Sequence, residues 1–154
     1  MTTVCPTDIV EAPLSLVWDL LTDPGNWGDF FDIRIGRVDP PGRARVGQRC
    51  QGYSGPRFLR LQVNFEFTKI DVTRHELGLD VRLPLGVRVS EDLHCTPLDV
   101  SRCRVSYGCG FGFPAGARGL LARAIMGREV RLGPIDSLSR LKRAAETIHA
   151  RSGR

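Results

Sequence analysis

The sequence predicts an α+β domain in which a curved antiparallel sheet of about seven strands wraps around one long C-terminal helix. Two observations predict this class. From residue 33 to residue 113, apolar and polar residues alternate in short runs, and no helix-sized segment separates the runs. Such strands pair as an antiparallel meander. From residue 115 onward the apolar residues instead have the spacing of a helix, so we expect this segment to cover the apolar face of the sheet.

The N-terminal part should form a first strand at residues 3–11, followed by two short helices. Between residues 13 and 21 the apolar positions 14, 17, 18 and 21 form one helical stripe. Asp23-Pro24 then signals a second helix start, because Asp suits the N-cap and Pro suits the first turn. In that second turn Trp27, Phe30 and Phe31 share a face.

The remaining elements follow from the same periodicities. The expected strands are residues 33–38, 44–52, 57–70, 73–83, 86–96 and 101–113, with turns at 39–42, 54–56 and 96–97. One side of these strands is apolar and the other is charged, which indicates one buried face and one wet face. In the last helix we expect a stripe made of positions 120, 121, 124, 138, 141, 145 and 148 to face the sheet. Gly133-Pro134 predicts a kink or two joined helices.

Size and composition predict a single domain over residues 1–154. No apolar run approaches the roughly 20 residues of a membrane helix, so no membrane insertion is expected. The N-terminus lacks a basic region followed by an apolar stretch, which favours a cytoplasmic location. The five cysteines are an odd number without C-x-x-C spacing. We therefore predict no disulfide framework, no metal site and no cofactor.

The charge is unevenly distributed along the chain. The net charge is +5, and the segment from residue 115 onward carries nine basic and three acidic residues, so all the excess positive charge lies there. A solvated helix face explains this best; attraction to an anionic partner is the alternative. No nucleic-acid partner is expected.

Four polar residues fall on the buried side of their strands, namely Gln48, His75, Glu91 and Tyr107. A buried carboxylate costs several kcal/mol unless it is paired or hydrogen-bonded. Glu91 therefore suggests an interior that holds water or a ligand, where it would act as a general acid or base. Tyr107 would donate to a ligand carbonyl, and His75 would shuttle protons. Two alternatives exist for Glu91: it pairs with an arginine, or a register slip of one residue places it outside. For His75 the alternative is exposure at the surface.

The apolar lining of this interior is predicted from the same faces. It comprises Trp27, Phe30, Phe31, Phe65, Phe67, Leu79, Leu93, Cys109 and Phe111. Trp27 and its two neighbours would form a wall or lid at the end of the space. In the run from Tyr107 to Phe113, glycine occupies every second position. We expect this pattern to allow sharp coiling of the sheet; a homodimer contact across the bare face is the alternative.

The segment VEAPLSLVWDLLTDPGNW (residues 10–27) resembles the opening of the superfamily that includes the START lipid-binding domains, the Bet v 1 allergens and the bacterial polyketide cyclase/dehydrase group (SRPBCC). Val46-Gly47 and the LxxLKRxAE pattern at residues 138–146 support the resemblance. It implies a helix-grip fold with a cavity for a small hydrophobic, aromatic or polycyclic ligand. Within such a fold the chain is expected to bind that ligand. The alternatives are a polyketide cyclase/dehydratase-type enzyme without metal or cofactor, and a protein-interaction module.

Overall fold

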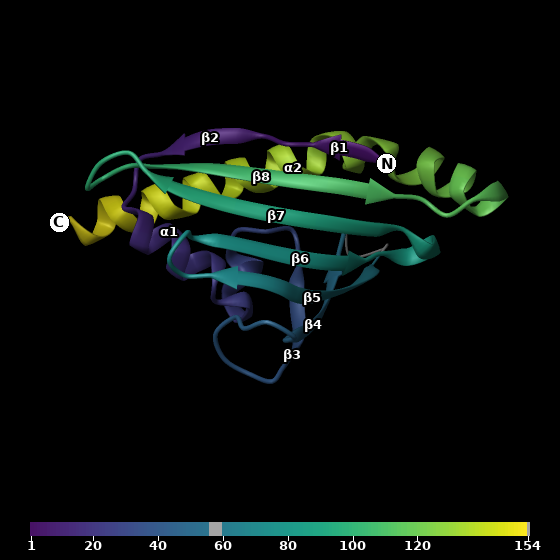
Figure 1. Cartoon of the computed structure of the whole chain (residues 1–154), viewed down its shortest axis with the longest axis horizontal. Helices are drawn as coiled ribbons and strands as arrows, with labels where there is room; N and C mark the ends of the chain where they lie inside the picture. The colour runs from purple at the N-terminus through teal and green to yellow at the C-terminus, as the bar shows by residue number, and fades with distance from the viewer. Residues whose placement is uncertain (56–59, 154) are drawn as a thin grey trace.

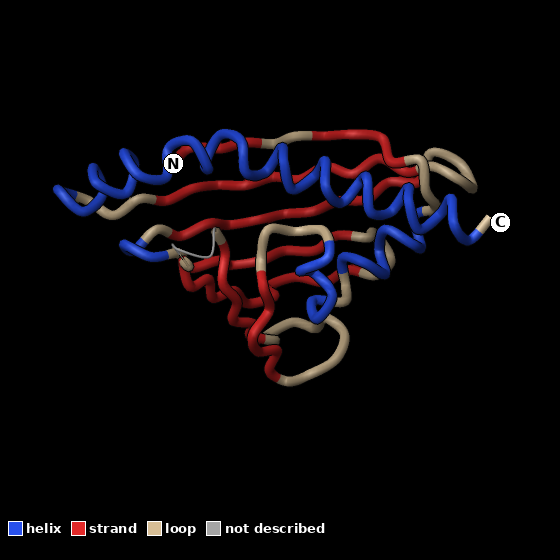
Figure 2. Tube along the Cα trace, turned by 180° about the vertical axis from the view of Figure 1, so that it is seen from behind, coloured by secondary structure: helices blue, strands red, loops and turns tan. Residues whose placement is uncertain are grey.

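The computed structural model describes residues 1–55 and 60–153. Within these residues, eight strands form one antiparallel sheet and a long helix lies across one face of it (Figures 1 and 2). The strands are β1 (Thr2–Val4), β2 (Thr7–Val10), β3 (Arg34–Asp39), β4 (Arg49–Ser54), β5 (Leu61–Asp71), β6 (Glu76–Arg82), β7 (Arg88–Pro97) and β8 (Cys103–Gly112). The helices are α1 (Leu14–Leu21), η1 (Pro24–Asp29), η2 (Pro84–Gly86) and α2 (Gly116–Ser152).

The strand order confirms the predicted meander. The sheet runs β1-β8-β7-β6-β5-β4-β3, with β2 also paired to β8. The expected first strand is split into β1 and β2 around Pro6, which has no N–H to give to a ladder. The Pro6 carbonyl still accepts a hydrogen bond from the Tyr107 N–H at 2.9 Å, so both pieces follow β8. This split raises the number of strands from about seven to eight.

Several expected boundaries differ from the structure. The strand predicted at residues 73–83 begins only at Glu76, and the turn predicted at residues 96–97 is wrong, because both residues belong to β7. The strand predicted at residues 44–52 begins only at Arg49, because the chain before it forms a turn. The strand predicted to start at residue 57 begins at Leu61 among the described residues, and residues 56–59, which include part of the expected turn at 54–56, lie outside them.

The long helix differs from its prediction in two respects. It runs from Gly116 to Ser152 as one helix with Pro134 inside it, so the predicted alternative of two joined helices is wrong. Pro134 is itself buried, and this packing offsets the hydrogen bond that proline removes. Leu120 and Leu121, expected to face the sheet, are 72% and 52% exposed. The buried stripe in this half instead lies at positions 119, 122, 126, 130, 134 and 138, with one step of three residues followed by steps of four.

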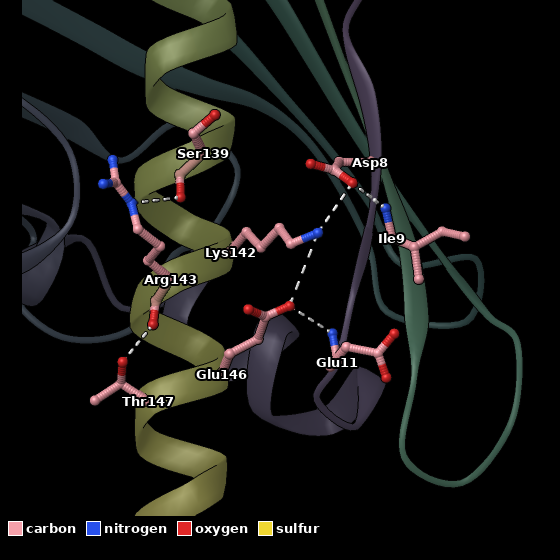
Figure 3. A network of polar contacts seen from close by, with 8 residues as sticks. All are labelled: Asp8, Ile9, Glu11, Ser139, Lys142, Arg143, Glu146 and Thr147. Carbon is pink, nitrogen blue, oxygen red and sulfur yellow. Dashed lines mark hydrogen bonds and ion pairs between the residues drawn. The ribbon is translucent and has the colours of Figure 1, made fainter.

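Polar contacts attach the C-terminal half of α2 to the edge of the sheet (Figure 3). Lys142 Nζ lies 3.2 Å from the Asp8 carboxylate and 3.9 Å from that of Glu146. The Glu146 carboxylate also accepts a hydrogen bond from the Glu11 N–H at 2.9 Å. These contacts join α2 to β2 and to the residue that follows it, which fixes the helix across the sheet.

The core lies between α2, the short helices and the inner face of the sheet. The inner residues of β5 to β8 are buried, as their alternation predicted, whereas the outer residues are mostly exposed. Part of the glycine-bare outer face of β8 is covered by the two residues that flank β1, since a Cβ on Gly110 would lie 3.3 Å from Met1 Sδ and one on Gly108 would lie 3.8 Å from Cys5 Sγ. Among the described helices, none has both the length and the hydropathy needed to cross a bilayer.

Candidate ligand-binding site

The sheet and α2 border a cavity of about 380 Å³ that opens to solvent. Its walls come from the inner faces of β5, β6, β7 and β8, from η1 and the residues after it, and from one side of α2. Nine of the residues predicted to line an interior are brought together here: Trp27, Phe31, Phe65, Leu79, Glu91, Leu93, Tyr107, Cys109 and Phe111. A curved sheet places alternate residues of neighbouring strands on one concave surface, which is why the period-two pattern identifies them.

Aromatic rings form the wall at one end of the cavity. Trp27 of η1 stacks on Phe65 of β5, with ring centroids 5.1 Å apart and planes inclined by 10°. It also meets the edge of Phe31 at 5.3 Å. The Trp27 Nε1–H donates to the Leu21 carbonyl at 3.2 Å, so the indole nitrogen has a partner although the ring is 4% exposed. The short 3₁₀ helix thus holds a flat aromatic surface toward the space.

Glu91 and Tyr107 place two polar groups in the part of the lining that comes from β5 to β8, which is otherwise apolar. Glu91 of β7 pairs with Cys109 of β8, and Leu93 pairs with Tyr107, so Glu91 and Tyr107 are diagonal neighbours on adjacent strands. Long side chains at such positions can reach each other. Tyr107 is 8% exposed, and Glu91 is half-buried on the cavity wall.

The surroundings alter the ionisation of both groups. Burial raises the pKa of Glu91 to about 7, and a hydrogen bond from Tyr107 opposes part of that rise. The pKa of Tyr107 is raised well above its usual value, mainly by burial and then by the nearby Glu91 charge. Near neutral pH, Glu91 can therefore give or take a proton, while Tyr107 keeps its hydroxyl proton and can donate a hydrogen bond.

Cys109 faces the same space but has no reactive character. Burial raises the pKa of its thiol, and the Glu91 charge raises it further. A thiol that stays protonated is a weak nucleophile, so Cys109 acts as apolar lining.

The mouth of the cavity carries charged residues that the sequence analysis did not identify. Asp32, Glu129, Asp136 and Arg140 line it, and all four are exposed. The wall from α2 also includes Met126 and Val130, which were missed because the wrong stripe of the helix was expected to face inward. Their i, i+4 spacing with Ala122 was the signal that could have found them.

Four predicted residues lie elsewhere than on the cavity wall. Phe67 is fully buried behind it, 5.6 Å from Trp27, and Phe30 packs against Phe31 at 4.7 Å. His75 lies at the β5–β6 turn with a φ of 53°, and its ring meets the edge of Trp18 at 5.2 Å. It is therefore a turn residue with no access to the cavity.

Gln48 also lies outside the cavity, although it is fully buried as predicted. Its Nε2 donates to the carbonyls of Pro40, Gly42 and Arg43 at 2.7, 3.1 and 3.3 Å. Its Oε1 has no partner among the described residues. The side chain holds the β3–β4 loop closed, so its polarity at a buried position has a structural reason.

A family comparison identifies the kind of protein to which this architecture belongs. The model of the family described as "Polyketide cyclase / dehydrase and lipid transport" matches residues 1–146. The chain belongs to this family. No curated protein matches the chain.

Several solved structures of low sequence identity have the same fold as this polyketide cyclase/dehydrase family member. The Zhui aromatase/cyclase from Streptomyces sp. R1128 is 18% identical, with a TM-score of 0.73 over 94% of this chain and 93% of that one. A point mutant of norcoclaurine synthase from Thalictrum flavum, in complex with a transition-state analogue, is 14% identical, with a TM-score of 0.70 over 97% and 96%. The di-domain aromatase/cyclase StfQ of the steffimycin pathway is 17% identical, with a TM-score of 0.70 over 97% of this chain and 47% of that one. At these identities the similarity shows the Bet v 1-like fold alone.

Proposed function

We propose that this protein binds a small apolar molecule with aromatic or fused rings in the cavity between the sheet and α2. The observation that carries the proposal is a cavity of about 380 Å³ whose sheet side is largely apolar and bounded by the stacked rings of Trp27 and Phe65. Small-molecule sites of this kind occupy roughly 300–1,000 Å³ and combine apolar walls with a few polar groups. The aromatic wall favours a flat ring system, because offset stacking adds to the effect of burial.

Glu91 and Tyr107 are the polar groups that would orient such a ligand. They lie side by side on β7 and β8 and project from an apolar wall. A ligand carbonyl or hydroxyl placed beside them would receive a hydrogen bond from Tyr107 and meet the carboxyl of Glu91. The pair therefore favours a ring system that carries oxygen substituents over a pure hydrocarbon.

The second candidate function is catalysis of the cyclase/dehydratase type, and the raised pKa of Glu91 favours it. With a pKa of about 7, Glu91 is suited to both proton abstraction and proton donation. In a dehydration, the Glu91 carboxylate would take the proton from the carbon next to a ligand carbonyl whose oxygen Tyr107 holds. A C=C bond would form as the neighbouring C–O bond breaks, and the protonated Glu91 would give its proton to the departing hydroxyl, which leaves as water.

The third candidate, a protein-interaction module, is favoured by a different observation. The outward side of the first half of α2 exposes Leu120, Leu121 and Ile125 beside the basic residues of this segment. This function predicts salt-sensitive association with an acidic partner and no small-molecule occupant of the cavity.

Native mass spectrometry of the freshly purified chain tests the binding proposal. A co-purifying small molecule, or saturable binding of an oxygenated polycyclic compound, is the expected result. A chain that is empty and that ignores a panel of such compounds would refute it.

Glu91→Gln then separates binding from catalysis. Gln keeps the size and a hydrogen-bonding group but cannot exchange a proton, so an enzyme would lose turnover and keep its affinity. The matched control is Asp92→Asn, which changes the next residue of the same strand on the exposed outer face. A Glu91→Gln variant with full turnover would exclude Glu91 as the acid–base group.

A further inference from the structure

A second hollow of about 180 Å³ adjoins the mouth of the cavity. We call it the arginine hollow; it is lined by Gly28, Phe31, Asp32, Ile33, Arg34, Tyr53, Gly55, Arg60 and Arg140. Four of these residues, Phe31, Asp32, Ile33 and Arg140, also line the cavity. A molecule seated in the cavity can therefore extend past Phe31 into the arginine hollow.

Three arginines converge on the arginine hollow from three different elements. Arg34 is the first residue of β3, Arg60 immediately precedes β5, and Arg140 projects from α2. Asp32 is the single carboxylate among the described residues that line it. The lining thus has an excess of positive charge at the point where the apolar cavity opens.

These arginines differ from those in a comparable hollow on the outer face of the sheet. There, Arg37, Arg49 and Arg82 also converge, but each lies within 4 Å of an acidic side chain. Within the described part of the chain, no ion pair involves any of the three arginines of the arginine hollow. The outer hollow is neutralised by the protein itself, whereas the arginine hollow has capacity for an added anion.

Two acidic residues of the mouth, both on α2, lie outside the arginine hollow. Glu129 and Asp136 of α2 line the cavity but do not line the arginine hollow. Asp136 lies about one helical turn before Arg140 on α2, so an anionic group on a cavity ligand is favoured inside the arginine hollow and not along the neighbouring part of the helix. The excess of positive charge in the arginine hollow therefore favours a ligand whose anionic group lies there.

We propose that the ligand is an amphiphilic anion, with its rings in the cavity and an oxyanion group bound in the arginine hollow by Arg34 and Arg140. This inference rests on the proposed binding function and adds the class of ligand to it. The planar guanidinium donates hydrogen bonds in a fork that matches the oxygens of carboxylate, sulfonate or phosphate. Arg140 lines both spaces, so it contacts the ligand where the apolar body meets the charged group.

Two fluorescent dyes with the same ring body test the proposal. 8-Anilinonaphthalene-1-sulfonate carries a sulfonate, and N-phenyl-1-naphthylamine is its neutral counterpart. In the double variant Arg34→Gln/Arg140→Gln, we expect the sulfonate dye to bind about tenfold more weakly for each arginine removed, since hydrogen bonds to charged groups are among the stronger ones. The neutral dye should lose much less affinity than the sulfonate dye, and an unchanged far-UV circular dichroism spectrum shows that the variant is folded.

A control of equal charge excludes a general electrostatic effect. Arg88→Gln/Arg104→Gln removes two exposed arginines from the outer face of β7 and β8. This double variant should bind both dyes as the unaltered chain does. Two results would overturn the arginine site while leaving the cavity proposal intact. One is an equal loss of affinity for the sulfonate dye in this control; the other is an Arg34→Gln/Arg140→Gln variant that loses no more affinity for the sulfonate dye than for the neutral dye. Failure of both dyes to bind the unaltered chain would instead refute the cavity function.

Discussion

Replacing Glu91 with Gln should make the stability of the protein less dependent on pH. Folding moves this carboxyl from water into a largely apolar wall, and burial raises its pKa from the usual 4.5 to about 7. The folded protein therefore binds the Glu91 proton more tightly than the unfolded chain does. The full stability is present below about pH 4.5, and it falls as the pH rises through about 7.

The pKa values give the size of this effect. At about 1.4 kcal/mol for each pKa unit, the rise from 4.5 to about 7 corresponds to about 3 kcal/mol of stability lost above pH 7. Gln has a similar shape but carries no charge, so it avoids this loss. The Glu91→Gln variant should thus match the unaltered protein near pH 4.5 and exceed its free energy of unfolding by about 3 kcal/mol near pH 8.

Urea denaturation of both proteins across this pH range measures the difference directly. All other titrating groups are common to the two proteins, so they cancel in the difference between the curves. Asp92→Asn serves as the control for loss of one carboxylate from the same strand on its exposed side. A difference that stays flat with pH, or a Gln variant that is the less stable protein near pH 8, would refute the view that Glu91 is a buried carboxyl without a compensating cation.

Three further predictions test the placement of individual side chains. Binding of an apolar ligand should change the fluorescence emission of Trp27, which lines the cavity, and not that of Trp18, which contacts His75. The fluorescence change on binding should therefore vanish in Trp27→Phe and persist in Trp18→Phe. The reverse result would place the ligand outside the cavity. Gln48→Leu should lower the free energy of unfolding by about 1–3 kcal/mol, because three loop carbonyls lose their hydrogen-bond donor. Urea titration measures the stability and ligand titration the affinity. A variant with weaker ligand binding but unchanged stability would contradict the placement of Gln48 outside the cavity. In the native protein an aromatic disulfide reagent should react rapidly with Cys5 alone, because the other four cysteines are buried. Burial also raises the pKa of Cys50 to about 11 and that of Cys95 to about 12, which keeps these thiols protonated and unreactive. A second rapidly reacting thiol would contradict this burial.

The sequence determined the class of fold and the faces of the strands. Period-two alternation is a local property, so it showed which residues of β5 to β8 point inward before any pairing was known. The absence of helical segments between those runs predicted the meander. The same alternation placed Glu91 and Tyr107 on the inner face, and the structure shows both on the wall of one cavity.

The spacing of apolar residues along the chain did not predict which face of α2 is buried. The stripe expected on α2 included Leu120 and Leu121, yet the helix turns a different row of residues, beginning with Gly119 and Ala122, toward the protein. A Cβ on Gly119 would lie 1.8 Å from the Pro114 carbonyl oxygen, so close backbone approach governs this end of the helix. Contacts of this kind join residues through space, and hydrophobicity along the chain does not encode them.

The candidate site divides in the same way. Alternation and a buried carboxylate were enough to predict from the sequence an apolar interior with Glu91 and Tyr107 in it. Only the tertiary structure separated the polar residues that line that interior from Gln48, which closes a loop, and His75, which forms a turn. It alone brought Arg34, Arg60 and Arg140 together at the mouth, because they come from three elements far apart in the chain. Periodicity fixes the side of a strand on which a residue lies, whereas the curvature of the sheet and the path of α2 decide what that side faces.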